Sequence, residues 1–243
     1  MAILNSIIGI LFIFAVAYLL SNNKKHIKWR TIIIGFLIQF GFALIVLKWS
    51  VGRYVLSKVA LGVQGVISYA NEGIGFVFGS LTNDGSIFVV NVLCVIIFIS
   101  AVVSILYYLG IMQFIIRVIG GALSKLLGTS QLETISPSAN IFLGQTEAPL
   151  LIKPYVAKLT ESELFTVMVG GLASVSGSIL VGYSLLGIPI EYLISASFMA
   201  APAGLIISKM LYPETEFDKI QNEVKMVKDD SANVVDAASK GAI

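Results

Sequence analysis

The sequence predicts an all-α, polytopic membrane protein, in which spanning helices alternate with interfacial helices and one re-entrant helical hairpin. Of the 243 residues, 57% are hydrophobic and only 12% are charged, whereas soluble domains carry about a quarter charged residues. Several apolar stretches reach the roughly 20 residues that a helix needs to cross a bilayer. A third observation is a polar, proline-rich segment at 136–155, which lies between two apolar regions.

The first 48 residues predict a scaffold of two spanning helices, Ala2–Leu20 and Thr31–Leu47. The first apolar run is too long for a signal-peptide core, so we interpret it as a retained helix. The loop between the two helices, SNNKKHIKWR, holds four Lys and Arg residues and no acid. The positive-inside rule therefore predicts that this loop is cytoplasmic and that the N-terminus lies outside. We interpret His26 as a solvated loop residue rather than a proton relay.

Residues 49–86 predict an interfacial helix followed by a glycine-rich connection. Polar residues interrupt the apolar pattern of Tyr54–Ala70, which indicates a helix lying in the membrane interface rather than crossing it. The sequence NEGIGFVFGS at 71–80 forms the connection, and Asn-Asp-Gly within 82–86 predicts a turn.

Residues 87–127 predict a spanning helix over Ile87–Met112 and an amphipathic helix over Gln113–Leu127. The first of these has no charged residue and is long enough to cross a bilayer with some tilt.

The segment Ser136–Tyr155 predicts the re-entrant hairpin, because it holds three of the six prolines, a central glycine and a glutamate. Proline cannot donate to a helical ladder, and a charged side chain at membrane depth costs roughly 2.5–3.5 kcal/mol on insertion scales. Irregular backbone is tolerated there only where protein or water covers it. We expect an inbound half at 133–143, an outbound half at 148–158 and a tip at Gly144–Glu147, as in many transporter sites.

Two further spanning helices are expected at Glu163–Leu186 and Ile188–Lys209, which complete a core domain at 128–212. The first contains the small-residue run GGLASVSGS at 170–178. This run favours close helix packing, and the alternative is a helix that interrupts its own ladder and offers carbonyl groups to an ion. Residues 213–243 predict a polar, partly helical segment.

Several functions are disfavoured by composition. The basic residues flank apolar segments and form no patch with interleaved aromatics, which argues against nucleic acid. One cysteine, Cys94, cannot form an intrachain disulfide, and a single histidine leaves no metal-ligand cluster or hydrolase arrangement. We therefore expect no enzyme, and a multi-pass protein of the plasma or inner membrane whose surroundings are the lipid bilayer.

The motif GQTEAPLLIKPY at 144–155 strongly resembles the first re-entrant hairpin of concentrative nucleoside transporters, of the bacterial sodium/nucleoside symporter type. Four further stretches resemble the same family in the same order, so the likeness covers nearly the whole chain: YANEGIGFVFGSL at 69–81, GGLASVSGSIL at 170–180, PAGLIISKMLYPETE at 202–216 and NVVDAA at 233–238.

The resemblance implies a homotrimer, built as an inverted repeat, that binds a nucleoside between two hairpins and two partly unwound helices. It implies that Gln145, Thr146 and Glu147 contact the nucleobase and that Ile179 lines the pocket. It assigns the coupling sodium ion, in place of any cofactor, to four residues: the side chains of Asn140 and Ser174 and the carbonyl groups of Leu143 and Val175. For Glu147 we favour this role over a structural ion pair, because the nearby Lys153 has the wrong spacing for one helical face.

The expected function is therefore cation-coupled symport of nucleosides, with sodium as the expected ion. Members of the family continue well beyond the position that matches Ile243, so the chain is expected to be the N-terminal part of the transporter, a fragment. The alternatives are a proton-coupled member, a hairpin transporter for another small polar solute, an inactive remnant, and a non-transporting subunit.

Overall fold

The computed structural model describes residues 2–79, 89–220, 226–227 and 229–243. Within these ranges every regular element is a helix, as the sequence predicts. The α-helices are α1 (Ala2–Leu19), α2 (Trp29–Leu47), α3 (Ser50–Phe78), α4 (Cys94–Tyr108), α5 (Ile111–Leu127), α6 (Gln131–Ala139), α7 (Glu161–Leu172), α8 (Gly177–Leu185), α9 (Ile190–Leu211) and α10 (Val234–Ala242). The other elements are the 3-10 segments η1 (Lys24–His26), η4 (Ala148–Lys158) and η5 (Phe217–Lys219) and the π-helical turn η3 (Val89–Leu93). The turn expected at 82–86 lies outside the described residues.

Four segments among the described residues are long and apolar enough to cross a membrane: Trp29–Val46, Val90–Tyr108, Glu161–Leu185 and Ile190–Leu211. The shorter apolar helix α1 exposes large side chains along its length, including Leu11 at 62% and Phe12 at 66%. Exposed apolar surface of this extent is typical of a membrane-facing helix. The expected helices at 2–20 and 31–47 agree with α1 and α2 to within two residues.

In the part of the chain before the expected hairpin, two expected boundaries differ from the structure. Of the apolar segment expected as one helix over 87–112, the described part from Val89 begins with the π turn η3, continues as α4 and ends before Gly110, whose φ of +80° favours glycine. The amphipathic helix α5 begins directly afterwards, at Ile111. In the other case α3 continues as a helix to Phe78, through most of the stretch expected as a connection.

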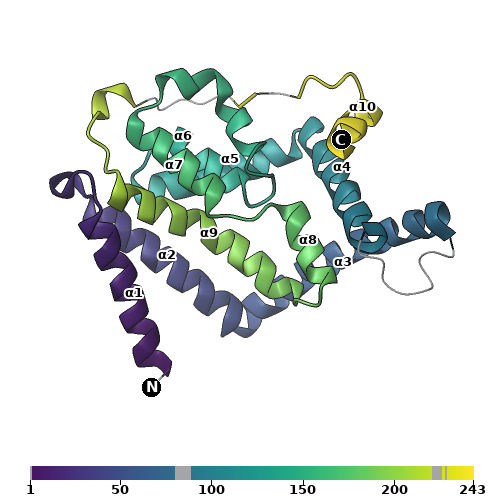
Figure 1. The fold of residues 1–243 in the computed structure, drawn as a ribbon, viewed down its shortest axis with the longest axis horizontal. Coiled ribbons are helices and arrows are strands. Elements are labelled where there is room, and N and C mark those ends of the chain that lie inside the picture. The colour runs from purple at the N-terminus through teal and green to yellow at the C-terminus, as the bar shows by residue number, and fades with distance from the viewer. Residues whose placement is uncertain (1, 80–88, 221–225, 228) are drawn as a thin grey trace.

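The helices pack in groups around four apolar clusters. One joins α5, α6, η4 and α7 through buried side chains such as Ile116, Leu132 and Ile152. A second joins α3, η3, α4, α8 and the start of α9, a third joins α1, α2 and the end of α9, and the fourth joins α5, α9 and Ile141. Figure 1 shows α9 running through the middle of the molecule, beside α2 and below α6 and α7. This helix therefore supports the hairpin and its neighbour from one side.

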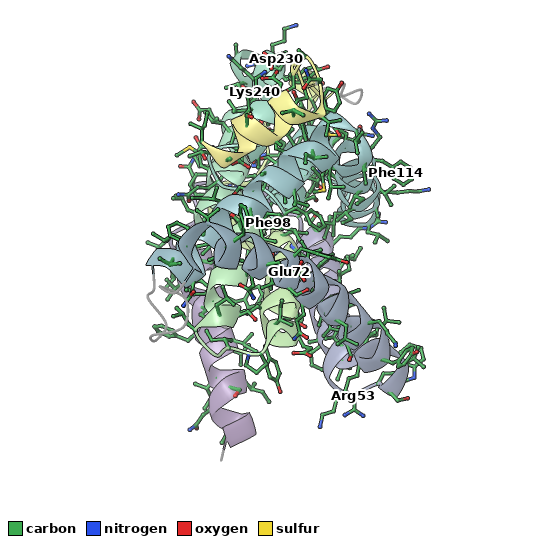
Figure 2. The ribbon with its side chains drawn as sticks, turned by 90° about the vertical axis from the view of Figure 1, so that its right-hand side faces the viewer. Arg53, Glu72, Phe98, Phe114, Asp230 and Lys240 are labelled. Atoms are coloured by element: carbon green, nitrogen blue, oxygen red, sulfur yellow. The ribbon has the colours of Figure 1, made fainter. Side chains whose placement is uncertain are left out.

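The C-terminal helix α10 lies against α4, as Figure 2 shows from the side; Asp230, which precedes the helix, and Lys240, in its last turn, are labelled near the top of the view. Lys240 Nζ lies 2.9 Å from Asp230 Oδ1. The two helices approach closely because Gly241 has no side chain: a Cβ there would lie 2.4 Å from the Cβ of Ser104. The predicted polar segment thus ends in a helix that is packed against the apolar part of the molecule.

Candidate functional site

At the position of the expected re-entrant hairpin, two helical arms, α6 and η4, pack against each other and are joined by a turn at 140–147. Ser130 and Glu133 form a capping box that starts α6, an arrangement that satisfies two otherwise free N–H groups. The outbound arm agrees with the expected 148–158, and Pro149 and Pro154 lie within it. The inbound arm ends earlier than expected, at Ala139, so the turn is longer than the four residues predicted for the tip.

The turn presents three exposed polar side chains in succession, Gln145, Thr146 and Glu147. Its shape is fixed by hydrogen bonds around Gly144: the N–H of Ala148 donates to the Gly144 carbonyl at 3.0 Å, and the Gly144 N–H donates to Glu147 Oε2 at 3.2 Å. Among the described residues no ion pair joins Glu147 to Lys153. The carboxylate of Glu147 therefore orders the turn with one oxygen and leaves the other available for a ligand.

The small-residue run at 170–178 combines both interpretations that its sequence allows. It packs closely, because a Cβ on Gly170 would lie 2.6 Å from Cγ of Pro137 on α6. It also interrupts its helix: α7 ends at Leu172, α8 begins at Gly177, and the residues between are not helical. Close helix packing, the interpretation that the sequence favours for 170–178, is therefore only part of the answer, because the helix is also interrupted there.

The break in α7–α8 lies directly against the hairpin turn. The N–H of Gly177 donates to the Phe142 carbonyl at 3.2 Å, and a Cβ on Gly177 would lie 2.8 Å from that oxygen. From α9, the Ser197 hydroxyl donates to the Ile141 carbonyl at 3.2 Å. The break before α8 and helix α9, which are distant in sequence from the turn, thus both hold the backbone at 141–142 in place.

Oxygen atoms suited to a monovalent cation gather where α6 and α7 end. Asn140 is 1% exposed, and neither polar atom of its side chain has a hydrogen-bond partner. Ser174 donates its hydroxyl proton to the Gly170 carbonyl at 2.7 Å, which leaves the oxygen lone pairs free to accept. Both helices point their C-terminal ends, with partial negative charge and free carbonyl groups, at this place. A buried amide without partners at two negative helix ends fits a cation that the site would bind.

The remaining expected residues are placed as follows. Leu143 is buried in the apolar cluster of α5–α7, and Val175 lies in the break and is 37% exposed. Since both side chains are apolar, only their carbonyl groups could bind an ion. Ile179 lies in the first turn of α8, 39% exposed, where its N–H donates to the Ser176 hydroxyl at 3.5 Å. The hairpin turn and the break are therefore brought together, and Ile179 lies just after the break, in the first turn of α8.

A second polar site lies at the other end of α6 and α7, and sequence reasoning missed it. Lys209, in the last turn of α9, contacts the carboxylate of Glu133, donates to the Ser162 hydroxyl at 2.8 Å and lies 3.9 Å from Glu214 Oε2. All four residues are buried, and we call them the ionic cluster. The capping-box pattern of Ser/Thr followed three residues later by Glu was readable at 130–133 and at 160–163. The contact of Glu133 with Lys209 on α9 could not be predicted from the sequence, since the two residues are far apart in the chain.

Comparison with known protein families gives consecutive matches along the chain. Residues 8–81 match the family model described as "Na+ dependent nucleoside transporter N-terminus", residues 89–189 match "Nucleoside recognition", and residues 192–243 match "Na+ dependent nucleoside transporter C-terminus".

Curated relatives and solved structures agree with these matches. The chain is 54% identical to an uncharacterized transporter, YutK, of Bacillus subtilis and 44% identical to the nucleoside permease NupC of Helicobacter pylori. These alignments cover 100% and 98% of the chain, but 61% and 58% of the relatives. It is also 39% identical to human solute carrier family 28 member 3, over 96% of the chain and 34% of that protein. The chain thus spans about three fifths of the length of the bacterial relatives.

Among solved structures, CNTnw in an inward-facing substrate-bound state superposes with a TM-score of 0.93 at 47% identity, over 100% of this chain and 59% of that one. A doubly substituted CNTnw in an outward-facing state gives a TM-score of 0.92 at 47% identity, over 98% of this chain and 59% of that one.

Proposed function

The chain belongs to the concentrative, Na+-dependent nucleoside transporter family, and on this premise we propose that it carries the first half of the binding site of a sodium-coupled nucleoside symporter. The observation that supports the proposal most directly is the contact between the hairpin turn and the break after α7, which brings Asn140 and Ser174 to two converging helix ends. The membrane location, the trimeric assembly and the activity of the whole protein are parts of the same proposal.

In this mechanism the nucleobase is held by the exposed groups of the turn. Gln145 offers both a donor and an acceptor, Thr146 a hydroxyl group, and Glu147 a charged acceptor, which together match the amide-like edges of a base. Ile179 supplies an apolar wall to the pocket. Because the Glu147 carboxylate is already bound to Gly144 N–H, it is positioned before the substrate arrives.

The coupling ion acts on the same stretch of backbone. Sodium bound by Asn140, Ser174 and the carbonyl groups of Leu143 and Val175 would link the turn to the break and so fix the groups that contact the base. By linkage, the ion then raises the affinity for the nucleoside as much as the nucleoside raises the affinity for the ion. All four ligands of this site are oxygen atoms, which Na⁺ prefers. None belongs to an acidic side chain, the kind of group that would take up and release a coupling proton.

The experiment is uptake of radiolabelled uridine into bacteria that lack nucleoside transporters and express the gene that encodes this chain. We expect uptake that requires an inward sodium gradient and that falls by most of its rate in Glu147→Gln. The matched control is Glu72→Gln, an exposed carboxylate on α3, which should leave uptake unchanged. Absence of uptake under both sodium and proton gradients would refute the proposal, while uptake driven by protons alone would replace the coupling ion.

A further inference from the structure

The ionic cluster has the composition of a cation-binding site whose resident cation is part of the chain. Lys209 Nζ has a hydroxyl oxygen of Ser162 at 2.8 Å, a carboxylate oxygen of Glu214 at 3.9 Å and the carboxylate of Glu133 in direct contact. Each of these oxygens comes from a different segment, namely α7, the stretch after α9, and α6. These are oxygen ligands of the kind that a bound monovalent cation has in a protein.

The buried charged residues of the described chain are three carboxylates, Glu133, Glu163 and Glu214, and one ammonium, Lys209. Glu214 Oε2 also accepts from the Thr160 hydroxyl at 2.7 Å, and Glu163 closes a capping box on Thr160 while its Oε1 atom has no hydrogen-bond partner. The N-terminal ends of α6 and α7 meet at these carboxylates and offset part of the charge.

The position of the cluster gives it a mechanical consequence. Helices α6 and α7 both begin at the cluster and both end at the proposed sodium site, at Asn140 and Ser174. Between the two ends they touch where Gly170 lies against Pro137. Lys209 thus contacts both helices near their starts, and Gly170 and Pro137 touch near their ends.

We propose that Lys209 is a tethered cation in an oxygen-lined site formed by Glu133, Ser162 and Glu214, and that it positions α6 against α7 for sodium binding. The site would accept a free primary alkylammonium ion once the lysine side chain is removed. Access exists, because Glu133, Lys209 and Glu214 also line a pocket of about 170 Å³ that is bordered by His26 and Lys28 of the loop before α2. The part of the proposal that concerns sodium rests on the proposed function, whereas the cation site itself does not.

The test uses Lys209→Ala in the protein expressed from its own gene and purified in detergent. We expect a lower thermal unfolding midpoint that n-propylammonium, which reproduces the chain from Cγ to Nζ, raises again by at least half of the loss. The uncharged analogue n-propanol should not raise it. The control variant Lys158→Ala removes an exposed lysine at the end of η4 and should neither lose stability nor respond to the amine. Equal rescue by n-propanol, or none by the amine, would overturn the cation site.

A second measurement separates positioning from simple stability. In uptake assays, Lys209→Ala should raise the sodium concentration for half-maximal uptake roughly tenfold, a typical coupling between two sites, while the nucleoside KM at saturating sodium stays near its normal value. Lys209→Arg should largely restore the sodium response. An unchanged sodium response in a folded Lys209→Ala protein would overturn the positioning role. If wild-type protein shows no uptake, the proposed function fails, and the rescue of unfolding still decides the cation site.

A double variant keeps the proposal testable if Lys209→Ala does not fold. Glu133→Gln combined with Lys209→Met removes both charges of the closest pair, so it should unfold at a higher temperature than either single variant. Losses that simply add in the double variant would show that the two groups do not act on each other, and would overturn the proposal.

Discussion

Two glutamates occupy equivalent positions in this protein and differ in their partners, so glutamine at each separates the effect of charge from that of helix capping. Glu133 is the third residue of α6 and Glu163 the third residue of α7, and each closes a capping box. Both are buried. Glu133 contacts Lys209, whereas Glu163 has one carboxylate oxygen without a hydrogen-bond partner.

The expected cost differs because only one variant breaks an ion pair. Removing one partner of a buried pair typically costs about 3–5 kcal/mol. In Glu133→Gln the amide oxygen can keep the capping bond from Ser130 N–H, but the NH2 group then takes the place of the carboxylate oxygen that contacts Lys209 and cannot accept from it. Glu163→Gln keeps the capping box and removes an uncompensated charge, so its stability should stay within about 1 kcal/mol of wild type or increase. For a chain of this size, about 3 kcal/mol corresponds to a midpoint lower by roughly 6–12 °C.

The assay is heating of the purified proteins in detergent, followed by size-exclusion chromatography to measure the folded fraction at each temperature. We expect Glu133→Gln to lose its folded peak well below wild type, and Glu163→Gln to follow wild type or exceed it. Equal losses in the two variants would refute the reasoning, because capping and burial would then explain both and the pair with Lys209 would contribute nothing.

Two further predictions concern the contact between the hairpin turn and its neighbours. Gly177→Ala places a Cβ 2.8 Å from the Phe142 carbonyl oxygen and should sharply reduce sodium-dependent uptake, whereas Gly171→Ala, with 3.6 Å to its nearest atom, should be tolerated; equal uptake in both would contradict the close approach. Ser197→Ala removes the hydrogen bond to the Ile141 carbonyl and should cost about 1 kcal/mol of stability in the same heating assay; a stability equal to wild type would show that this bond does not hold the turn.

Much of the helical framework follows from the sequence because hydropathy reports burial in lipid directly. The ends of α1 and α2 and the start of η4 lie where charge, proline or polar residues stop an apolar run. The interruption before α5 was harder to predict, because Gly110 sits inside a continuous apolar stretch and only its positive φ ends the helix. The end of α3 was also predicted wrongly. Its glycines indicate a connection, but in the structure they remain part of the helix.

The site was predictable as far as residue types allowed. The turn with Gln145 to Glu147 follows from proline and glycine placement, but the break after α7 did not follow from spacing, because small residues permit both packing and interruption. The ionic cluster needs tertiary structure: Glu133 and Lys209 are far apart in the chain, and their contact depends on α9 returning to the start of α6.

The central claim, that Asn140 and its neighbours bind the coupling ion, is tested most directly by equilibrium binding of radioactive sodium to the purified protein. We expect saturable binding by wild type and an affinity roughly tenfold lower or worse in Asn140→Ala, the loss expected for an interaction of about 1.4 kcal/mol. The matched control Asn71→Ala, at an exposed position on α3, should bind as wild type does. Sodium binding by Asn140→Ala with wild-type affinity would contradict the account.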